Sequence, residues 1–283
     1  MTVVIKVGGA RAVDPAGALA DVASLADGRD VVLTHGGSTA VDDTLERLGI
    51  EPEYVETPSG VVGRFTDAET MDVFKMAMPG LVNTDMVTAL QNEGIDAVGL
   101  SGVDGKLLHG PRKSAVRVVE DGKRKIRRGD HSGSIEAVNT ALLETLLGDG
   151  YVPVVSPPMA GADDESNITP VNTDADRSAA AIAGGLGATL VLLTDVPGIL
   201  EDPDDGSTLI ETIETPTDWD RLEDAAEGFM ERKVMAIEEG LGAGADRAIV
   251  ANANADDPVT SALEGSGTHI TQAAVTLDGG EHA

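Results

Sequence analysis

A lysine inside an apolar run is the first residue whose type and position suggest chemistry. Lys6 lies in the run VVIKV (3–7), which is otherwise Val and Ile and is followed by Gly8 and Gly9. An unpaired ammonium group is costly to bury in such a strand. A lysine at the end of a strand and directed into a cleft avoids that cost by meeting phosphate, and neighbouring glycines let backbone amides approach the same anion.

A second glycine pair, Gly36 and Gly37 in THGGS (34–38), also follows an apolar run. Ligands of open α/β sheets lie at the carboxyl ends of the strands, where glycine lets N–H groups face an anion. Either pair alone fits a tight strand-to-helix turn equally well. Two such pairs, one of them beside Lys6, favour a binding site.

Asn172 and Asp176 lie at the predicted start of an Ala-rich helix, in NTDADRSAAAIAGG (172–185). Thr173 followed three residues later by Asp176 fits an N-cap with a capping-box partner. A carboxylate at this position can also orient nearby ammonium groups, and capping alone does not require Asn172. The residues alone leave both interpretations open.

Lys233, in GFMERKV (228–234), is one of only seven lysines, and no lysine lies between Lys125 and Lys233 or after it. A solvated cation on a helix is the simplest explanation of this residue.

The stretch LLTDVPGIL (192–200), with Thr194, Asp195 and Gly198, is an apolar run followed by a polar loop and a Pro-Gly turn. It either holds a nucleotide base or simply turns the chain.

Short apolar runs and helical segments alternate along the chain, and these elements must position the residues above. Strands are predicted at 3–7, 31–34, 152–156, 188–194 and 247–251, and residues 95–102 are predicted to be a strand followed by a loop. Helices are predicted after Pro15 and over about 39–48, 67–92 with a break at Pro79-Gly80, 134–148, 173–186 and about 229–240. The alternation predicts an α/β fold, a three-layer αβα sandwich around a mostly parallel sheet.

One segment interrupts this alternation. Residues 115–128 alternate on either side of Asp121-Gly122, which predicts a β-hairpin. Eight of the 20 cations lie between Arg112 and Arg128: Arg112, Lys113, Arg117, Lys123, Arg124, Lys125, Arg127 and Arg128. They predict either a docking surface for an acidic macromolecule or a cluster paired with the chain's own carboxylates, for example at a subunit contact.

Composition excludes several classes of function. The net charge of −29 argues against nucleic acid and anionic membranes as partners, and the absence of Cys excludes disulfides and thiol nucleophiles. The five His show no metal-binding spacing, so no metal site is expected. We expect no membrane span and no signal peptide, and many carboxylates with few lysines are typical of a halophile's cytoplasmic protein.

In this order, KVGG, HGG, NTDAD, LLTDVPGIL and GFMERKV resemble the motifs of the amino-acid kinase superfamily, N-acetylglutamate kinase and its relatives in particular. PSGVVGRFTDAET (58–70), AVGLSGVDG (97–105) and GYVPVVSPP (150–158) are similar to one branch. That branch phosphorylates the side-chain carboxylate of glutamate or 2-aminoadipate held on an amino-group carrier protein. One departure is Ser38, where many acetylglutamate kinases have a third glycine.

The resemblance implies ATP with Mg²⁺ held through its phosphates, and it implies roles for single residues. Lys6 and Lys233 would stabilise the transferring phosphoryl group, and Asp176 would hold the two lysines. The residues implied to bind the substrate are Gly36, Gly37, Arg64 and Asn172, and those implied to bind ATP are Gly8, Gly9, Thr194, Asp195 and Gly198. Arg64 would act as a fork for a carboxylate.

The resemblance also implies two lobes, 1–186 for the substrate and 187–283 for ATP, and a homodimer acting in arginine or lysine biosynthesis. An acidic carrier protein would dock at Arg112–Arg128. Two alternatives remain open: a kinase of free N-acetylglutamate, and a non-catalytic regulatory protein that binds an amino acid or nucleotide. Lys6 and Lys233 argue against the second. Glutamate and 2-aminoadipate differ by one methylene, which the sequence does not resolve.

Overall fold

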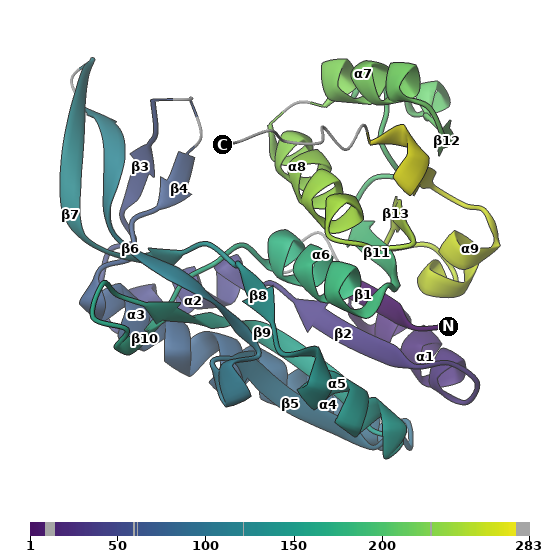
Figure 1. Cartoon of the computed structure of the whole chain (residues 1–283), viewed down its shortest axis with the longest axis horizontal. Helices are drawn as coiled ribbons and strands as arrows, with labels where there is room; N and C mark the ends of the chain where they lie inside the picture. Colours follow the sequence, from purple (N-terminus) through teal and green to yellow (C-terminus); the bar gives the residue numbers. More distant parts are fainter. Residues whose placement is uncertain (9–14, 59, 61, 121, 227, 276–283) are drawn as a thin grey trace.

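The structure is a computed structural model that describes residues 1–8, 15–58, 60, 62–120, 122–226 and 228–275 (Figure 1). Within this part of the chain, the main sheet has 12 strands, and its central path runs β12-β14-β13-β11-β1-β2-β9-β6-β7. Strands β5 and β10 pair with β9, and β8 pairs with β6. A separate two-stranded sheet consists of β3 and β4.

The strands are β1 (Val3–Val7), β2 (Val31–His35), β3 (Tyr54–Glu56), β4 (Val62–Arg64), β5 (Ala97–Gly102), β6 (Leu108–Glu120), β7 (Lys123–Gly133), β8 (Ala137–Val138), β9 (Val152–Ala162), β10 (Ile168–Val171), β11 (Thr189–Thr194), β12 (Thr212–Ile213), β13 (Arg247–Asn252) and β14 (Thr268–Thr271). The α-helices are α1 (Pro15–Ala26), α2 (Ser38–Arg47), α3 (Ala68–Lys75), α4 (Asn83–Asn92), α5 (Thr140–Gly148), α6 (Ala175–Leu186), α7 (Pro216–Ala225), α8 (Phe229–Gly242) and α9 (Pro258–Glu264). A π-helix, η1 (Met76–Val82), joins α3 to α4, and single 3-10 turns are η2 (Asp104–Lys106), η3 (Gly206–Thr208) and η4 (Gln272–Ala274).

Strand β1 is the centre of the sheet and pairs in parallel with β2 and β11. All five of its residues are buried, as expected of a strand covered on both faces. Successive side chains of a strand point to opposite faces, so Val3, Ile5 and Val7 pack on one face while Val4 and Lys6 point to the other. Lys6 is therefore directed toward the layer that contains α6 and α8.

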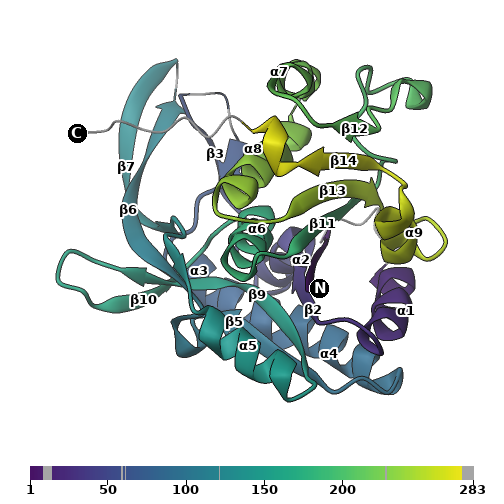
Figure 2. The same cartoon turned by 45° about the vertical axis from the view of Figure 1, so that its right-hand side comes forward.

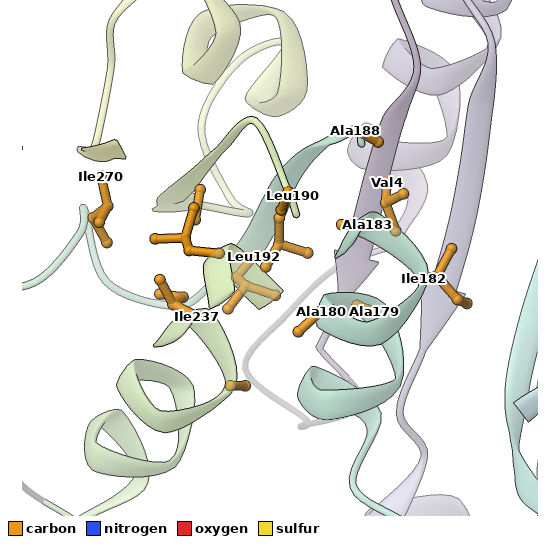
Figure 3. Close-up of a cluster of buried hydrophobic side chains, with 14 of the residues drawn as sticks. Val4, Ala179, Ala180, Ile182, Ala183, Ala188, Leu190, Leu192, Ile237 and Ile270 are labelled. Atoms are coloured by element: carbon orange, nitrogen blue, oxygen red, sulfur yellow. The ribbon is translucent and has the colours of Figure 1, made fainter. Parts of the chain in front are cut away.

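Helices cover both faces, so the expected three-layer α/β arrangement is confirmed. One apolar cluster packs α6, α7 and α8 on the sheet, and part of it, with Val4, Ala180, Leu190 and Ile237, is drawn in Figure 3. The other cluster packs α1, α4 and α9 on the opposite face. Figure 2 shows α6 and α8 on one side of β11 and β13, with α1 and α9 on the other.

Several predicted boundaries were wrong. Residues 134–139 are not helical, because β8 pairs with β6 there and α5 begins only at Thr140. Strand β9 continues beyond Ser156 to Ala162, where β6 and β10 pair with it. Pro79 does not break the helical region, because the wider turn of η1 accommodates it between α3 and α4.

The predicted hairpin is present as β6 and β7, which pair from Glu120 and Lys123 back to Arg112 and Gly133. In the sheet, β1, β2 and the strands on their side come from residues 1–186, whereas β11 to β14 come from later residues. The two groups meet at the β1–β11 pairing, and the division into two functional lobes stays a prediction. Within the described residues, no helix has the length and apolarity that a membrane span requires.

Candidate active site

Three charged side chains from three elements meet above the carboxyl end of β1. The Lys6 ammonium lies 2.8 Å from Asp176 Oδ1, and Lys233 Nζ donates a hydrogen bond of 2.9 Å to Asp176 Oδ2. The side chains of Lys6, Lys233 and Asp176 are 8%, 13% and 11% exposed, so the cluster is largely shielded from solvent.

The start of α6 explains why Asp176 is free to hold the lysines. Asp174, and not Thr173 as predicted, is the N-cap, because its side chain accepts the N–H groups of Asp176 and Arg177 at 2.8 and 3.1 Å. The capping requirement is thus met by a neighbour. The Asp176 carboxylate then points into the sheet face, toward Lys6.

Close helix packing explains how Lys233 reaches the same carboxylate. Helices α6 and α8 approach through small residues: a Cβ at Gly184 would lie 2.6 Å from Ala243 Cβ, and one at Gly240 would lie 3.1 Å from Ala180 Cβ. Larger residues at these two glycines would push α8 away. The separation of the helices therefore sets the position of the Lys233 ammonium group.

The electrostatics of the cluster favour a further anion. Burial alone would raise the pKa of Asp176, but Lys6 and Lys233 outweigh it and lower that pKa to about 2. Burial lowers the pKa of Lys6, and the charge of Lys233 adds to this effect while Asp176 opposes it. With both lysines protonated, two cations face one carboxylate, and an arriving phosphate would compensate the excess positive charge.

Two buried residues that the sequence did not single out, His35 and Asn83, contact the turn after β2 and each other. His35 is fully buried; its Nδ1 lies 3.0 Å from the Gly36 carbonyl oxygen and its Nε2 lies 3.1 Å from Asn83 Nδ2. Burial chiefly lowers its pKa, to about 4, and Lys6 contributes, so His35 is neutral at pH 7. Gly99 leaves the space that the Asn83 side chain occupies, because a Cβ at Gly99 would lie 2.2 Å from Asn83 Oδ1.

Gly8, Gly36 and Gly37 lie at the carboxyl ends of β1 and β2. Gly36 N–H donates to the Val7 carbonyl oxygen at 3.3 Å, which joins the end of β2 to the end of β1. Gly37 precedes α2, and a Cβ there would lie 2.5 Å from Met78 Sδ. Gly8 directly follows β1, whereas Gly9 lies outside the described residues.

The side chains of Arg64 and Asn172 already have partners in the chain. Arg64 donates to Asp42 Oδ1 from Nε and Nη2 at 3.1 and 2.7 Å, and from Nη2 to the Ser38 carbonyl oxygen at 2.9 Å. Asn172 Nδ2 donates to Thr66 Oγ1 at 3.1 Å. Both side chains are therefore held in fixed orientations, and their roles toward a substrate stay predictions.

Three of the predicted ATP residues, Thr194, Asp195 and Gly198, lie at or after the end of β11. Thr194 is buried and its hydroxyl donates to Asp195 Oδ1 at 3.2 Å, while Asp195 itself is exposed. Gly198 is buried, and a Cβ there would lie 2.6 Å from Leu209 Cδ1 and 2.7 Å from Thr268 Oγ1, so close packing explains this glycine.

A cavity of about 440 Å³ lies next to this loop; its lining includes Pro197, Leu209, Asn252 and Pro258. A larger one, about 500 Å³, runs along the outer face of α6 beside Arg177 and Glu239 and is not lined by Lys6 or Lys233. In the described residues, no group of three or more His, Asp or Glu could hold a metal ion.

The sequence and the fold of the chain are similar to those of known proteins. A model of the amino acid kinase family matches residues 1–252. The chain is 42% identical to LysW-aminoadipate kinase of Thermus thermophilus, over 95% of this chain and 99% of that one. It is 44% identical to acetylglutamate kinase of Methanopyrus kandleri, over 94% of this chain and 99% of that one.

Solved structures share the fold. Carbamate kinase of Giardia superposes with a TM-score of 0.66 at 20% identity, covering 95% of this chain and 98% of that one. N-acetylglutamate synthase of Neisseria gonorrhoeae superposes with a TM-score of 0.69 at 25% identity, and the match covers 95% of this chain and 59% of that one.

Proposed function

The chain belongs to the amino acid kinase family, and from this premise we propose that it transfers the γ-phosphoryl group of ATP to a side-chain carboxylate. The acceptor is glutamate or 2-aminoadipate attached through its amino group to a small carrier protein, and the product is an acyl phosphate. The observation that carries the proposal is the pair of buried ammonium groups on Asp176. The name of the Thermus relative, LysW-aminoadipate kinase, supports the carrier-linked acceptor.

The chemistry requires positive charge and positioning. A carboxylate acceptor is already ionised, so no general base is needed, and the transferring group carries charge on its equatorial oxygens. ATP supplies the phosphoryl group, and Mg²⁺ would be held through the ATP phosphates. Lys6 and Lys233 stabilise the charge of the transition state, and Asp176 positions both ammonium groups.

The two substrates would approach from opposite sides of β1. Gly8 follows β1, and Thr194 ends β11 and is followed by Asp195, on the side that we assign to ATP. The 440 Å³ cavity near Pro197 suits the nucleoside. Gly36, Gly37, Arg64 and Asn172 lie on the acceptor side. Because Arg64 is paired with Asp42, we expect it to bind the acceptor with the donors that this pair leaves, or to exchange partners when the acceptor arrives.

One face of the β6–β7 hairpin suits an acidic carrier protein. Residues directly opposite in an antiparallel pair share a face, so the pairs Arg117–Ile126, Val119–Arg124 and Ala115–Arg128 lie on one face. On this face Ile126 is 69% exposed, and Arg117, Arg124 and Arg128 are exposed beside it. We define these four residues as the docking face.

The other face of the hairpin is turned toward the protein. Val118 is buried there, and Lys125 pairs with Glu120 at 2.8 Å. Arg127 pairs with Glu53 and lies over the Phe65 ring, 4.1 Å from its centre. Lys125 and Arg127 are thus paired with the chain's own carboxylates, as the alternative prediction expects of the cluster, whereas the docking face presents exposed cations around an apolar centre, which suits a partner.

Free N-acetylglutamate is the second candidate acceptor, favoured by the Methanopyrus relative named acetylglutamate kinase. The experiment that decides is acceptor-dependent ADP release with Mg²⁺-ATP in high KCl. It offers carrier-linked glutamate, carrier-linked 2-aminoadipate, N-acetylglutamate or no acceptor. We expect turnover with a carrier-linked acceptor; turnover with N-acetylglutamate alone would favour the second candidate.

Further parts of the proposal rest on the resemblance and on composition. We expect a homodimer acting in the cytoplasm in arginine or lysine biosynthesis, with residues 1–186 binding the acceptor and 187–283 binding ATP. The net charge of −29 supports a halophilic source, since molar salt screens such self-repulsion. Light scattering in high KCl tests the oligomeric state directly.

A further inference from the structure

Arg232 connects two elements that carry opposite parts of the active site. Its Nη2 donates a hydrogen bond of 2.5 Å to the carbonyl oxygen of Val62. Arg232 directly precedes Lys233 on α8, and Val62 lies two residues before Arg64 on β4. Consecutive side chains on a helix point about 100° apart. On α8, Arg232 therefore reaches β4 while the next residue, Lys233, reaches Asp176.

Strand β4 is tied to α2 by Arg64, and the bond from Arg232 ties it to α8. It belongs with β3 to a two-stranded sheet separate from the main sheet, and an isolated pair of strands is only marginally stable. In Figure 1, β4 is the strand of this pair that faces α8, and the bond from Arg232 agrees with that view. The bond therefore joins the β3–β4 pair, which carries Arg64, to the helix that carries Lys233.

We propose that Arg232 is a positioning residue that holds β4 against α8 and so keeps the acceptor and nucleotide sides of the site closed on each other. This rests on the proposed function. If each ligand binds the closed state, its apparent dissociation constant rises as the closed fraction falls. Without the Arg232 bond, the ligand that binds first must spend part of its binding free energy on closing the site. The second ligand then meets a site that is already closed, so its affinity is not reduced.

The test measures dissociation constants for carrier-linked glutamate and for a non-hydrolysable ATP analogue with Mg²⁺, each alone and with the other saturating. Arg232→Ala should weaken either ligand alone about tenfold, the size of one hydrogen bond from a charged donor, and by less than about twofold when the other is saturating. Arg232→Lys should recover part of the loss. Arg221→Ala, which removes an exposed cation paired with Glu201, is the matched control.

Two outcomes would overturn the proposal: equal weakening with and without the second ligand, or weaker nucleotide binding with unchanged acceptor binding, which would make Arg232 a phosphate contact. Hydrogen exchange on the unliganded protein is an independent readout. Amides of β3 and β4 should exchange faster in Arg232→Ala than in Arg221→Ala. This measurement needs no acceptor, so it tests the link between α8 and β4 even where the proposed acceptor is wrong, and unchanged exchange contradicts it.

Discussion

Lys233, on α8, donates a hydrogen bond of 2.9 Å to Oδ2 of Asp176, which lies 57 residues earlier at the start of α6. The other oxygen of the same carboxylate lies 2.8 Å from the Lys6 ammonium at the end of β1. One carboxylate thus sets the spacing between two cations from distant parts of the chain. If this spacing serves phosphoryl transfer, a change at any of the three residues should lower turnover.

Replacing Lys233 should impair turnover far more than folding. In Lys233→Ala we expect kcat to fall about 10²–10³-fold, the usual loss when one charge stabiliser is removed, with a melting temperature close to wild type. Lys6→Ala should behave alike, and the double variant should lose much less than the product of the two effects, because the lysines act as a unit. Steady-state kinetics and thermal melts measure both quantities.

Lys75→Ala is the matched control, since Lys75 is an exposed lysine paired with Asp72. Its turnover should equal that of wild type. Full activity in Lys233→Ala would identify Lys233 as an ordinary surface residue.

Asp176 should matter for turnover and for acid stability. Asp176→Asn keeps the shape but removes the charge that holds both lysines, so kcat should collapse. The pKa of Asp176 is lowered to about 2, so its ionised form stabilises the fold above the ordinary pKa near 4, and this contribution is lost as pH falls through about 2. Urea unfolding between pH 7 and pH 2 should show a gap of about 2 kcal/mol between wild type and variant that closes in this acid range. A gap independent of pH, or normal turnover, would contradict this role.

Local signals in the sequence single out two parts of this cluster, whereas its assembly with Lys233 was implied only by the resemblance to the amino-acid kinase superfamily. Lys6 in an apolar strand and Asp176 at the start of a helix can be recognised directly in the sequence. The N-cap was assigned to Thr173 rather than Asp174, since the choice between adjacent capping residues depends on backbone geometry at the end of β10. His35 with Asn83 and Arg232 with Val62 join residues far apart in sequence, and no local pattern predicts such pairs.

Asp21 should stabilise the fold without affecting catalysis. From α1, its carboxylate accepts the N–H groups of Val259 and Thr260 at 2.7 and 2.8 Å and the Thr260 hydroxyl at 2.6 Å, and so caps α9 from a distance. Asp21→Ala should lower the free energy of unfolding by about 2 kcal/mol and leave kcat unchanged. The exposed Asp27→Ala should be neutral in the same denaturation experiment. Equal stabilities of the two variants would refute the capping role.

The docking face should determine affinity for the carrier. Replacing Arg117, Arg124 and Arg128 together by Gln should raise KM for the carrier-linked acceptor severalfold and leave kcat and KM for ATP unchanged. Salt screens exposed charges, so the difference should shrink as KCl rises. The assay therefore needs the lowest salt concentration at which the protein stays folded.

A charge-matched control replaces three exposed arginines elsewhere, namely Arg29, Arg47 and Arg221. It changes the net charge equally and should leave KM for the carrier-linked acceptor unchanged. If both triple variants shift this KM alike, net charge and not the docking face is responsible. An unchanged KM in the docking-face variant at every salt concentration would assign those arginines a structural role.

The identity of the product tests the central claim most directly. Wild-type protein is incubated with Mg²⁺-ATP and hydroxylamine in high KCl, in one reaction with a carrier-linked acceptor and in another with free N-acetylglutamate. Mass spectrometry analyses the intact carrier or the free amino acid. An acyl phosphate reacts with hydroxylamine, so we predict a hydroxamate on the acceptor side chain with wild type and almost none with Lys233→Ala. ADP release without any hydroxamate, on the carrier or on free N-acetylglutamate, would contradict phosphoryl transfer to a carboxylate.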